Sequence, residues 1–241
     1  MSADSTLVAE GAHAAPAAAN VEDLFSLARR ATAAREATLG RRGTFARARR
    51  LLSTGAWRGP SDAAVSYVEA VDLPALGGWA AARAAGAAVL VGGDVAALRE
   101  AAGARLVARV PFRSGETEEE RLGRLRALAS TGLPLWGVIP TPEGEPYGLD
   151  TLRFTASCRL ELARVPHVVA DVEALGPRLA QMCLGFGADE LHAQVMGERA
   201  LRLGDNANST VLLRTEAVTL IRGAVLVPAE RLANDVLEDV T

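Results

Sequence analysis

Three polar side chains occupy positions where an α/β enzyme would keep its acid and base groups. Glu116 follows one apolar run of the chain, whereas Glu69 and His192 lie within two others. If those runs are parallel strands, side chains near their carboxyl ends face the rim at which barrel enzymes carry out their chemistry. Glu116, Glu69 and His192 are therefore the candidate catalytic residues.

Both carboxylates also have a structural interpretation. Glu116 could cap the helix expected to begin near Thr117, because a side-chain oxygen there can accept hydrogen bonds from unpaired backbone N–H groups. Glu69 lies in an apolar run, and an inward-facing carboxylate could pair with an arginine such as Arg109. The sequence leaves both interpretations open.

The histidines give a weaker signal. In a strand, His192 shares one face with Glu190 and Gln194, which makes a short polar row. Two histidines and a carboxylate could bind a metal ion, but nothing in the sequence brings His167 near His192. We therefore predict no metal site, and expect His167, next to Pro166, to hydrogen-bond backbone at the start of a strand.

Two segments could bind an anion. Gly92 and Gly93 follow an apolar run and are the candidate cofactor-binding residues, although a lone Gly-Gly pair is a weak phosphate signal. Five arginines lie between residues 41 and 50. That segment is either an anion-contacting patch or a solvated strand edge, and the second is the default.

Composition excludes several classes of function. All 26 basic residues are arginines, so no lysine can form a Schiff base or serve a P-loop. The net charge of −3 and the 4% aromatic content argue against a nucleic-acid partner. No apolar run approaches the ~18 residues of a membrane span, and the N-terminus does not resemble a signal peptide. Cys158 and Cys183 lie in helical segments with apolar neighbours, and we expect buried, inert thiols in a soluble cytoplasmic protein.

Short β-branched runs alternate with helical periods, which is typical of βαβ units and a parallel sheet. The 241 residues, 49% of them hydrophobic, are enough for one such α/β domain. Six or seven strands favour a trimmed or partial TIM-like barrel over an open sheet. The expected strands are 44–52, 63–71, 87–93, 105–112, 133–141, 166–173 and 189–196, with helices over 21–37, 118–130 and 151–164.

The two ends of the chain differ from this pattern. Residues 1–19 are Ala-rich and aperiodic, and we expect a disordered tail there. The single domain then takes residues 20–241, and Asn20 can cap its first helix. Residues 212–240 have a helical character that one glycine and one proline interrupt.

A series of short motifs runs through the last third of the chain. In order they are Arg159-Leu160, Leu162, Pro166-His167-Val168, Leu175-Gly176, Leu179-Ala180-Gln181 and Phe186-Gly187-Ala188-Asp189-Glu190-Leu191. Their order resembles the radical SAM enzymes of the futalosine route to menaquinone, aminofutalosine synthase and dehypoxanthine futalosine cyclase. Upstream segments match the same family, including Gly115-Glu116-Thr117 and Glu120-Arg121, so the resemblance covers most of residues 20 to 235.

The resemblance implies a radical SAM-type barrel, but one segment of the family's pattern is missing. In the family the first strand leads into a C-x-x-x-C-x-x-C loop that holds a 4Fe-4S cluster, which cleaves S-adenosylmethionine. Here Leu52 passes through "STGAWRGPSD" directly to the next recognisable strand, as if the cluster loop and one βα unit were deleted. Because such a cluster needs neighbouring thiolates and the two cysteines are far apart, no cofactor is predicted.

Other departures fall at positions that contact ligands in the family. The family's G-T-x-x-E-E motif is degraded over residues 193–198, and Gly92-Gly93 has lost the Ala-Glu that follows it in the family. The resemblance therefore implies a pseudoenzyme that binds a menaquinone precursor or an active paralogue. A barrel that lacks a βα unit leaves strand edges unpaired, which favours a homodimer or a complex with that paralogue.

An enzyme of the same route is the alternative. It would use Glu116, Glu69 and His192 as acid and base groups in chemistry that needs no cluster. A methyltransferase has little support, because the SAM-contacting turns are the parts that are absent or degraded.

Overall fold

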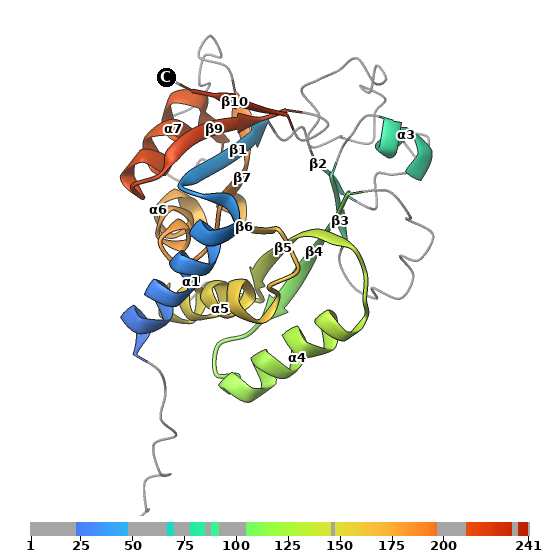
Figure 1. Ribbon diagram of the computed structural model, residues 1–241, viewed down its shortest axis with the longest axis vertical. Helices are drawn as coiled ribbons and strands as arrows, with labels where there is room; N and C mark the ends of the chain where they lie inside the picture. Colours follow the sequence, from blue (N-terminus) through green and yellow to red (C-terminus); the bar gives the residue numbers. More distant parts are fainter. Residues whose placement is uncertain are drawn as a thin grey trace, which may run out of the picture.

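The computed structural model describes most of the central and C-terminal chain (Figure 1). The described residues are 23–47, 67–69, 78–84, 88–91, 105–145, 148–196, 211–232 and 236–240. The expected tail, the candidates Gly92 and Gly93, and the segment after the first strand lie outside these residues.

The strands form one curved sheet in the order β10-β9-β1-β7-β6-β5-β4-β3-β2, with β8 beside β7. Every pairing is parallel except that of β10 with β9. The α/β prediction of a partial TIM-like barrel is thus confirmed. The strands are β1 Arg42–Arg47, β2 Tyr67–Glu69, β3 Ala88–Val91, β4 Arg105–Phe112, β5 Leu135–Pro142, β6 His167–Asp171, β7 Glu190–Met196, β8 Val211–Leu213, β9 Val227–Arg231 and β10 Leu237–Asp239.

The helices mostly alternate with these strands, as the sequence pattern predicts. Figure 1 shows α1, α5, α6 and α7 together on one side of the sheet, where α1 packs against α5 and α6 against α7. The helices are α1 Leu24–Leu39, α3 Trp79–Ala84, α4 Glu118–Ser130, α5 Gly148–Glu161, α6 Val172–Leu184 and α7 Arg214–Gly223.

Helix starts follow local capping chemistry. α1 is capped by Asp23, whose carboxylate accepts a hydrogen bond from the Ser26 backbone N–H, so the prediction of Asn20 as the cap was wrong. Asp23 is the cap because the helix begins at Leu24, directly after it. α6 bends at Gly176, where φ is 73° and Pro177 follows.

The C-terminal segment differs most from the prediction. α7 ends at Gly223, and the residues after it form β9 and β10 rather than more helix. The reason is tertiary: β9 pairs in parallel with the edge of β1, from Arg42 beside Val227 to Ala46 beside Arg231. Hydrogen bonds to an available strand edge outweigh the weak helical pattern of this short segment.

The two faces of the sheet pack differently. The outer face joins the helices in one large apolar core, to which β4, β6 and β7 contribute alternate residues and β5 contributes Leu135 and Val138. The inner face has a small apolar layer of its own, made of Ala46, Ala88, Val107, Trp136, Ile139 and Val169. Among the described helices, none has the length and apolar content required to cross a membrane.

Candidate functional site

The inner face of the sheet changes character along its strands. Polar side chains lie at the strand starts, the small apolar layer follows, and charged side chains return toward the carboxyl ends. Arg109 stands two residues after Val107 on β4, and Asp171 two residues after Val169 on β6, so both share the inner face with that layer. The carboxyl ends of parallel strands are where barrel enzymes bind ligands, so this end is the candidate site.

Arg109 and Asp171 form an ion pair at this end. Arg109 Nη1 donates to Asp171 Oδ2 at 2.9 Å. The other carboxylate oxygen accepts from the Glu173 backbone N–H at 3.0 Å and thereby caps α6. The Asp171 side chain is 5% exposed and that of Arg109 is 24% exposed, so the arginine is the more accessible partner. An interior carboxylate, that of Asp171, thus pairs with Arg109. Whether Glu69 also does so stays a prediction, because the Glu69 side chain lies outside the described residues.

His192 lies next to this pair. On β7 it is in register with Asp171 of β6 and with Ala46 of β1, which places its side chain on the inner face as well. The residue is partly buried. An imidazole on the same face as a fixed carboxylate can in principle transfer protons, so His192 remains a candidate acid–base group.

Glu116 has arginine and backbone partners at the end of β4. Its carboxylate accepts from Arg124 Nη2 at 2.6 Å and from the Arg113 backbone N–H at 3.1 Å. The hydrogen bond from Arg124 is the main reason that the pKa of Glu116 lies below its ordinary value. The helix cap is not Glu116 but Thr117, which forms a capping box with Glu120. These contacts favour a structural ion pair over a general base.

Glu69 lies at the end of β2, as the strand prediction required. Its side chain is outside the described residues, as are Gly92 and Gly93. Of the predicted catalytic residues, the structure thus places His192 beside the Arg109–Asp171 pair. The described contacts of Glu116 belong to a separate cluster of α4 and the loop before it.

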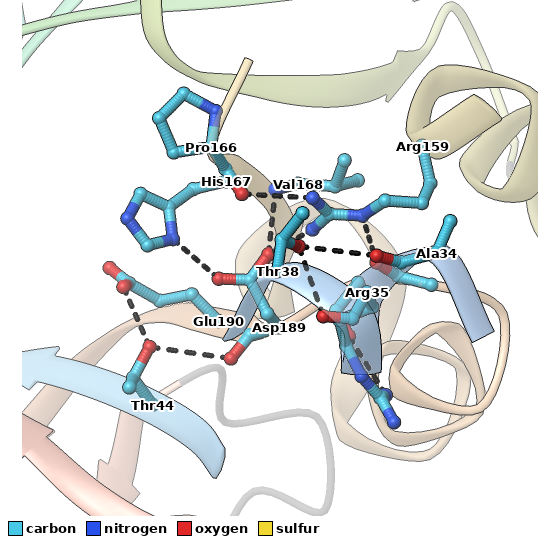
Figure 2. A network of polar contacts seen from close by, with 12 residues as sticks. Ala34, Arg35, Thr38, Thr44, Arg159, Pro166, His167, Val168, Asp189 and Glu190 are labelled. Atoms are coloured by element: carbon cyan, nitrogen blue, oxygen red, sulfur yellow. Dashed lines mark hydrogen bonds and ion pairs between the residues drawn. The ribbon is translucent and has the colours of Figure 1, made fainter. Parts of the chain in front are cut away.

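A second polar cluster lies at the opposite end of the barrel, where the strands begin (Figure 2). Its centre is Asp189, which is 2% exposed. The carboxylate accepts hydrogen bonds from Arg159 Nη2 and from the Val168 backbone N–H, the latter at 2.8 Å, and lies 2.6 Å from His167 Nδ1. Burial alone would raise the pKa of Asp189, but His167, Arg159 and the Val168 N–H together lower it below its ordinary value.

Glu190 continues this cluster into the inner face. Its Oε2 accepts from Thr44 Oγ1 at 2.7 Å and from Arg231 Nε at 2.5 Å. The Arg231 guanidinium lies 4.9 Å from the centre of the Trp136 ring, and that ring is 4.2 Å from His167. β9 therefore supplies the counter-charge for a glutamate that is fully buried on β7.

Three of these residues could suggest a metal site. His167, Asp189 and Glu190 offer ligand atoms that all lie within 4.8 Å of one another. Each carboxylate, however, is already paired with an arginine, and two guanidinium groups would repel a cation. The strand starts of a barrel are also the end associated with stability rather than chemistry. We interpret this cluster as structural, and the absence of a metal stays a prediction.

The cluster is assembled from the motifs that carry the sequence resemblance. Arg159 links them, because its Nε donates to the Gly187 carbonyl and its Nη1 to the Pro166 carbonyl, each at 2.8 Å. Gly187 has φ +94°, and a Cβ there would lie 2.9 Å from the Ala31 side chain. His167 does stand at a strand start as predicted, but it binds the Asp189 carboxylate instead of backbone. Sequence reasoning grouped none of these residues into one site.

The two cysteines are buried in α5 and α6, as predicted. Burial raises the pKa of the Cys158 thiol above its ordinary value and that of Cys183 to about 11. Both are therefore protonated near neutral pH.

Comparison with known proteins finds similarity to a curated enzyme and to solved structures. No family model matches the chain. Over 133 residues the chain is 31% identical to the aminodeoxyfutalosine synthase of Thermus thermophilus. The similarity to aminodeoxyfutalosine synthase is confined to this stretch. The matched stretch covers 48% of this chain but only 36% of that enzyme, so about a third of the enzyme's length is represented.

The resemblance to aminodeoxyfutalosine synthase predicted from the motifs is thus confirmed. The crystal structure of methylornithine synthase superimposes with a TM-score of 0.59 and 13% sequence identity, and covers 86% of this chain and 89% of that one. At this identity the match shows the fold alone. It supports the predicted partial barrel.

Proposed function

We propose that this chain is a degenerate radical SAM-like protein of the futalosine route, which has no iron–sulfur cluster and acts by binding. It would be a cytoplasmic pseudoenzyme that binds a menaquinone precursor or an active paralogue. The observation that carries this proposal is the position of its thiols. The 241 residues contain two cysteines, and both lie buried in helices of the outer layer.

The thiols do not fit the family's cluster. A 4Fe-4S cluster of this family is held by three neighbouring thiolates, and here only Cys158 and Cys183 exist, on different helices. Burial raises the pKa of each thiol, which disfavours the thiolate that binds iron. By contrast, the polar side chains around Asp189, which belong to the motifs shared with the family, keep their hydrogen bonds to one another. This supports a protein that has kept the fold of the family and lost its chemistry.

Iron analysis tests the first half of the proposal. The protein would be reconstituted anaerobically with iron and sulfide and then assayed for S-adenosylmethionine cleavage, beside an active aminodeoxyfutalosine synthase as a positive control. We expect neither stoichiometric iron nor 5′-deoxyadenosine. Iron at cluster stoichiometry with cleavage would refute the proposal.

Binding tests the second half. Titration calorimetry with aminodeoxyfutalosine should show saturable heat if a small molecule of the route is the ligand. Sedimentation of the protein alone and mixed with the active synthase should show a dimer or a complex if a protein is the partner. A monomer that binds neither would contradict the proposal.

Cluster-independent acid–base chemistry is the second candidate function. The observation that favours it is the register of His192 with Asp171 on neighbouring strands. A His192→Asn variant should then abolish turnover of a precursor of the route, followed by mass spectrometry, while Glu116→Gln leaves it within a few-fold. Equal loss in both variants, or no turnover by the unmodified protein, would reject this candidate.

A further inference from the structure

We infer that the turn between α7 and β9, together with the residues beside it, binds an acidic, aliphatic segment of a protein partner. This inference rests on the binding role proposed above and names the chemistry of the segment that is bound. The surface lies where the strands begin, at the opposite end from the candidate small-molecule site. It consists of Arg41, Arg42, Arg222, Val225 and Val227, which we call the basic–apolar patch.

Backbone contacts join the five residues into one surface. α7 ends where β9 begins, next to the start of β1 (Figure 1). Arg41 Nη2 donates to the Val225 carbonyl at 3.1 Å, and the Val227 N–H donates to the Arg41 carbonyl at 2.8 Å. Arg42 is in register with Val227, and the Val225 N–H donates to the Arg222 carbonyl at 2.9 Å. All five residues are exposed, so the patch is continuous.

The apolar part of the patch is held at a cost. Val225 and Val227 are 69% and 53% exposed, on either side of the buried Leu226. Val225 has φ 61°, and it is the non-glycine residue with positive φ in the part of the chain that the structure describes. β-branched residues rarely adopt this conformation, and the position after a helix usually carries glycine or asparagine. A strained valine in water gains nothing from folding, whereas a partner that covers it would explain it.

The charged part of the patch is positive. Among the described residues, neither Arg41 nor Arg222 has a carboxylate partner. Arg42 lies 3.4 Å from Asp239, and more than half of each of these two side chains is exposed. The patch therefore has an excess of positive charge, and a complementary surface is acidic. Arginine beside exposed apolar side chains is also typical of protein–protein interfaces.

A peptide segment fits this patch better than a membrane does. Helices that lie on an anionic membrane bury Trp, Phe and Leu side chains, and the patch has none of these. Its apolar part is two valines of one turn, with arginines beside them. An extended peptide alternates its side chains, so aliphatic and acidic groups can both reach a patch of this size.

Two short blocked peptides provide a matched pair of probes. One alternates glutamate with valine and leucine, and in the other glutamine replaces every glutamate. Titrations followed by NMR chemical shifts at low salt should give the glutamate peptide a dissociation constant about fivefold or more below that of the glutamine peptide. Each exposed ion pair is expected to contribute a factor of about 1.4 to 5. Added salt should reduce this preference, because the charges are exposed.

Two variants separate the charged from the apolar contribution. Arg222→Gln should reduce the preference for the glutamate peptide about twofold or more, since one ion pair is lost. Val225→Asn should weaken the binding of both peptides about twofold or more, because it removes the aliphatic contact. The same variant should raise the melting temperature, because asparagine tolerates the left-handed conformation. Weaker binding in a more stable protein is a result that a purely structural role of Val225 does not give.

Matched controls lie at the other end of the molecule. Val236 is 54% exposed, and its carbonyl accepts from the Leu232 N–H at 2.8 Å, beyond the carboxyl end of β9. Arg178 is exposed near the start of α6, which follows the carboxyl end of β6. Val236→Asn and Arg178→Gln should leave the affinities for both peptides unchanged. If Val225→Asn were unfolded, the comparison of Arg222→Gln with Arg178→Gln would still decide.

Several results would overturn the inference. Equal affinity for the two peptides, or binding of neither, would do so, as would losses in the control variants as large as those in the patch variants. Binding to vesicles of anionic lipid without binding to the glutamate peptide would assign the patch to a membrane instead. Sedimentation that shows a dimer disrupted by Val225→Asn would assign it to a second copy. A cluster found by iron analysis would contradict the proposed function whatever the peptide result, so the two failures are distinguishable.

Discussion

Asp189 joins segments that are far apart in the chain, since its partners come from α5 and from the start of β6. Asp189→Asn would leave the buried Arg159 without its counter-charge. We expect the free energy of unfolding to fall by about 3–5 kcal/mol, the range for breaking a buried ion pair. Urea unfolding followed by circular dichroism measures it.

Asp239→Asn is the matched control, because it removes the carboxylate of an exposed pair. Arg42 and Asp239 lie 3.4 Å apart with more than half of each side chain exposed. The loss should stay below about 1 kcal/mol. Similar losses in the two variants would mean that burial does not decide the strength of these pairs.

The buried carboxylate of Asp189 also makes stability depend on pH. The pKa values of Asp189 and Glu116 lie below their ordinary values in the folded protein, so the unfolded chain binds protons more readily. Their contribution is therefore complete above the ordinary carboxyl range and is lost as the pH falls through and below it. Urea midpoints measured from about pH 7 to about pH 3 should decrease steadily, and less steeply for Asp189→Asn than for the unmodified protein.

For single residues, the sequence predicted burial better than it predicted interaction partners. Buried cysteines could be predicted because apolar helical neighbours decide burial. Asp171 was missed because the strand was expected to run on to residue 173, which hid an aspartate directly before a helix. The preference of aspartate for helix caps was the available signal. The partner of His167 lies 22 residues away, a separation that no local pattern encodes.

At the scale of elements, the turn before β7 depends on one glycine. Gly187 has φ +94°, and an added Cβ would lie 2.9 Å from Ala31 Cβ and 3.0 Å from Arg159 Cβ. Gly187→Ala should thus both strain the backbone and push α1 away from α5. We expect a loss of about 1–3 kcal/mol in the free energy of unfolding, measured by urea titration.

Gly123→Ala is the opposite case. Gly123 lies inside α4 with nothing within 4 Å of an added Cβ. Alanine there should stabilise the protein by about 0.5–1 kcal/mol, because glycine loses more backbone entropy in a helix. If both substitutions destabilised the protein equally, the contact with α1 would not be the cause.

Elements were predictable where one residue pattern dominates. β4 and α4 have the predicted bounds, since a β-branched run and a capping box mark them clearly. β9 was not predictable, because it forms a strand by pairing with the edge of β1, which is distant from it in the sequence. Arg231 of β9 donates a hydrogen bond to the buried Glu190 of β7. Because the two residues lie in different segments, a pattern within one segment could not reveal this pair.

At the scale of the whole molecule, the sheet order predicts a gradient of stability. β5 and β6 each have a neighbour on both sides, whereas β2 and β10 are three-residue strands at the two ends of the order. Native-state hydrogen exchange at neutral pH should therefore be slowest in β5 and β6 and fastest in the two end strands. Mass spectrometry of peptides that separate these strands would measure it.

A concentration series connects this gradient to the proposed partners. If a second copy covers an edge, exchange of β2 or β10 should slow as the protein concentration rises, while β5 and β6 stay unchanged. Exchange that is independent of concentration, with the end strands fast throughout, would argue against a homodimer built on these edges. It would leave the active paralogue as the protein partner to test, and adding that synthase to the same exchange experiment would show whether it protects either end of the sheet.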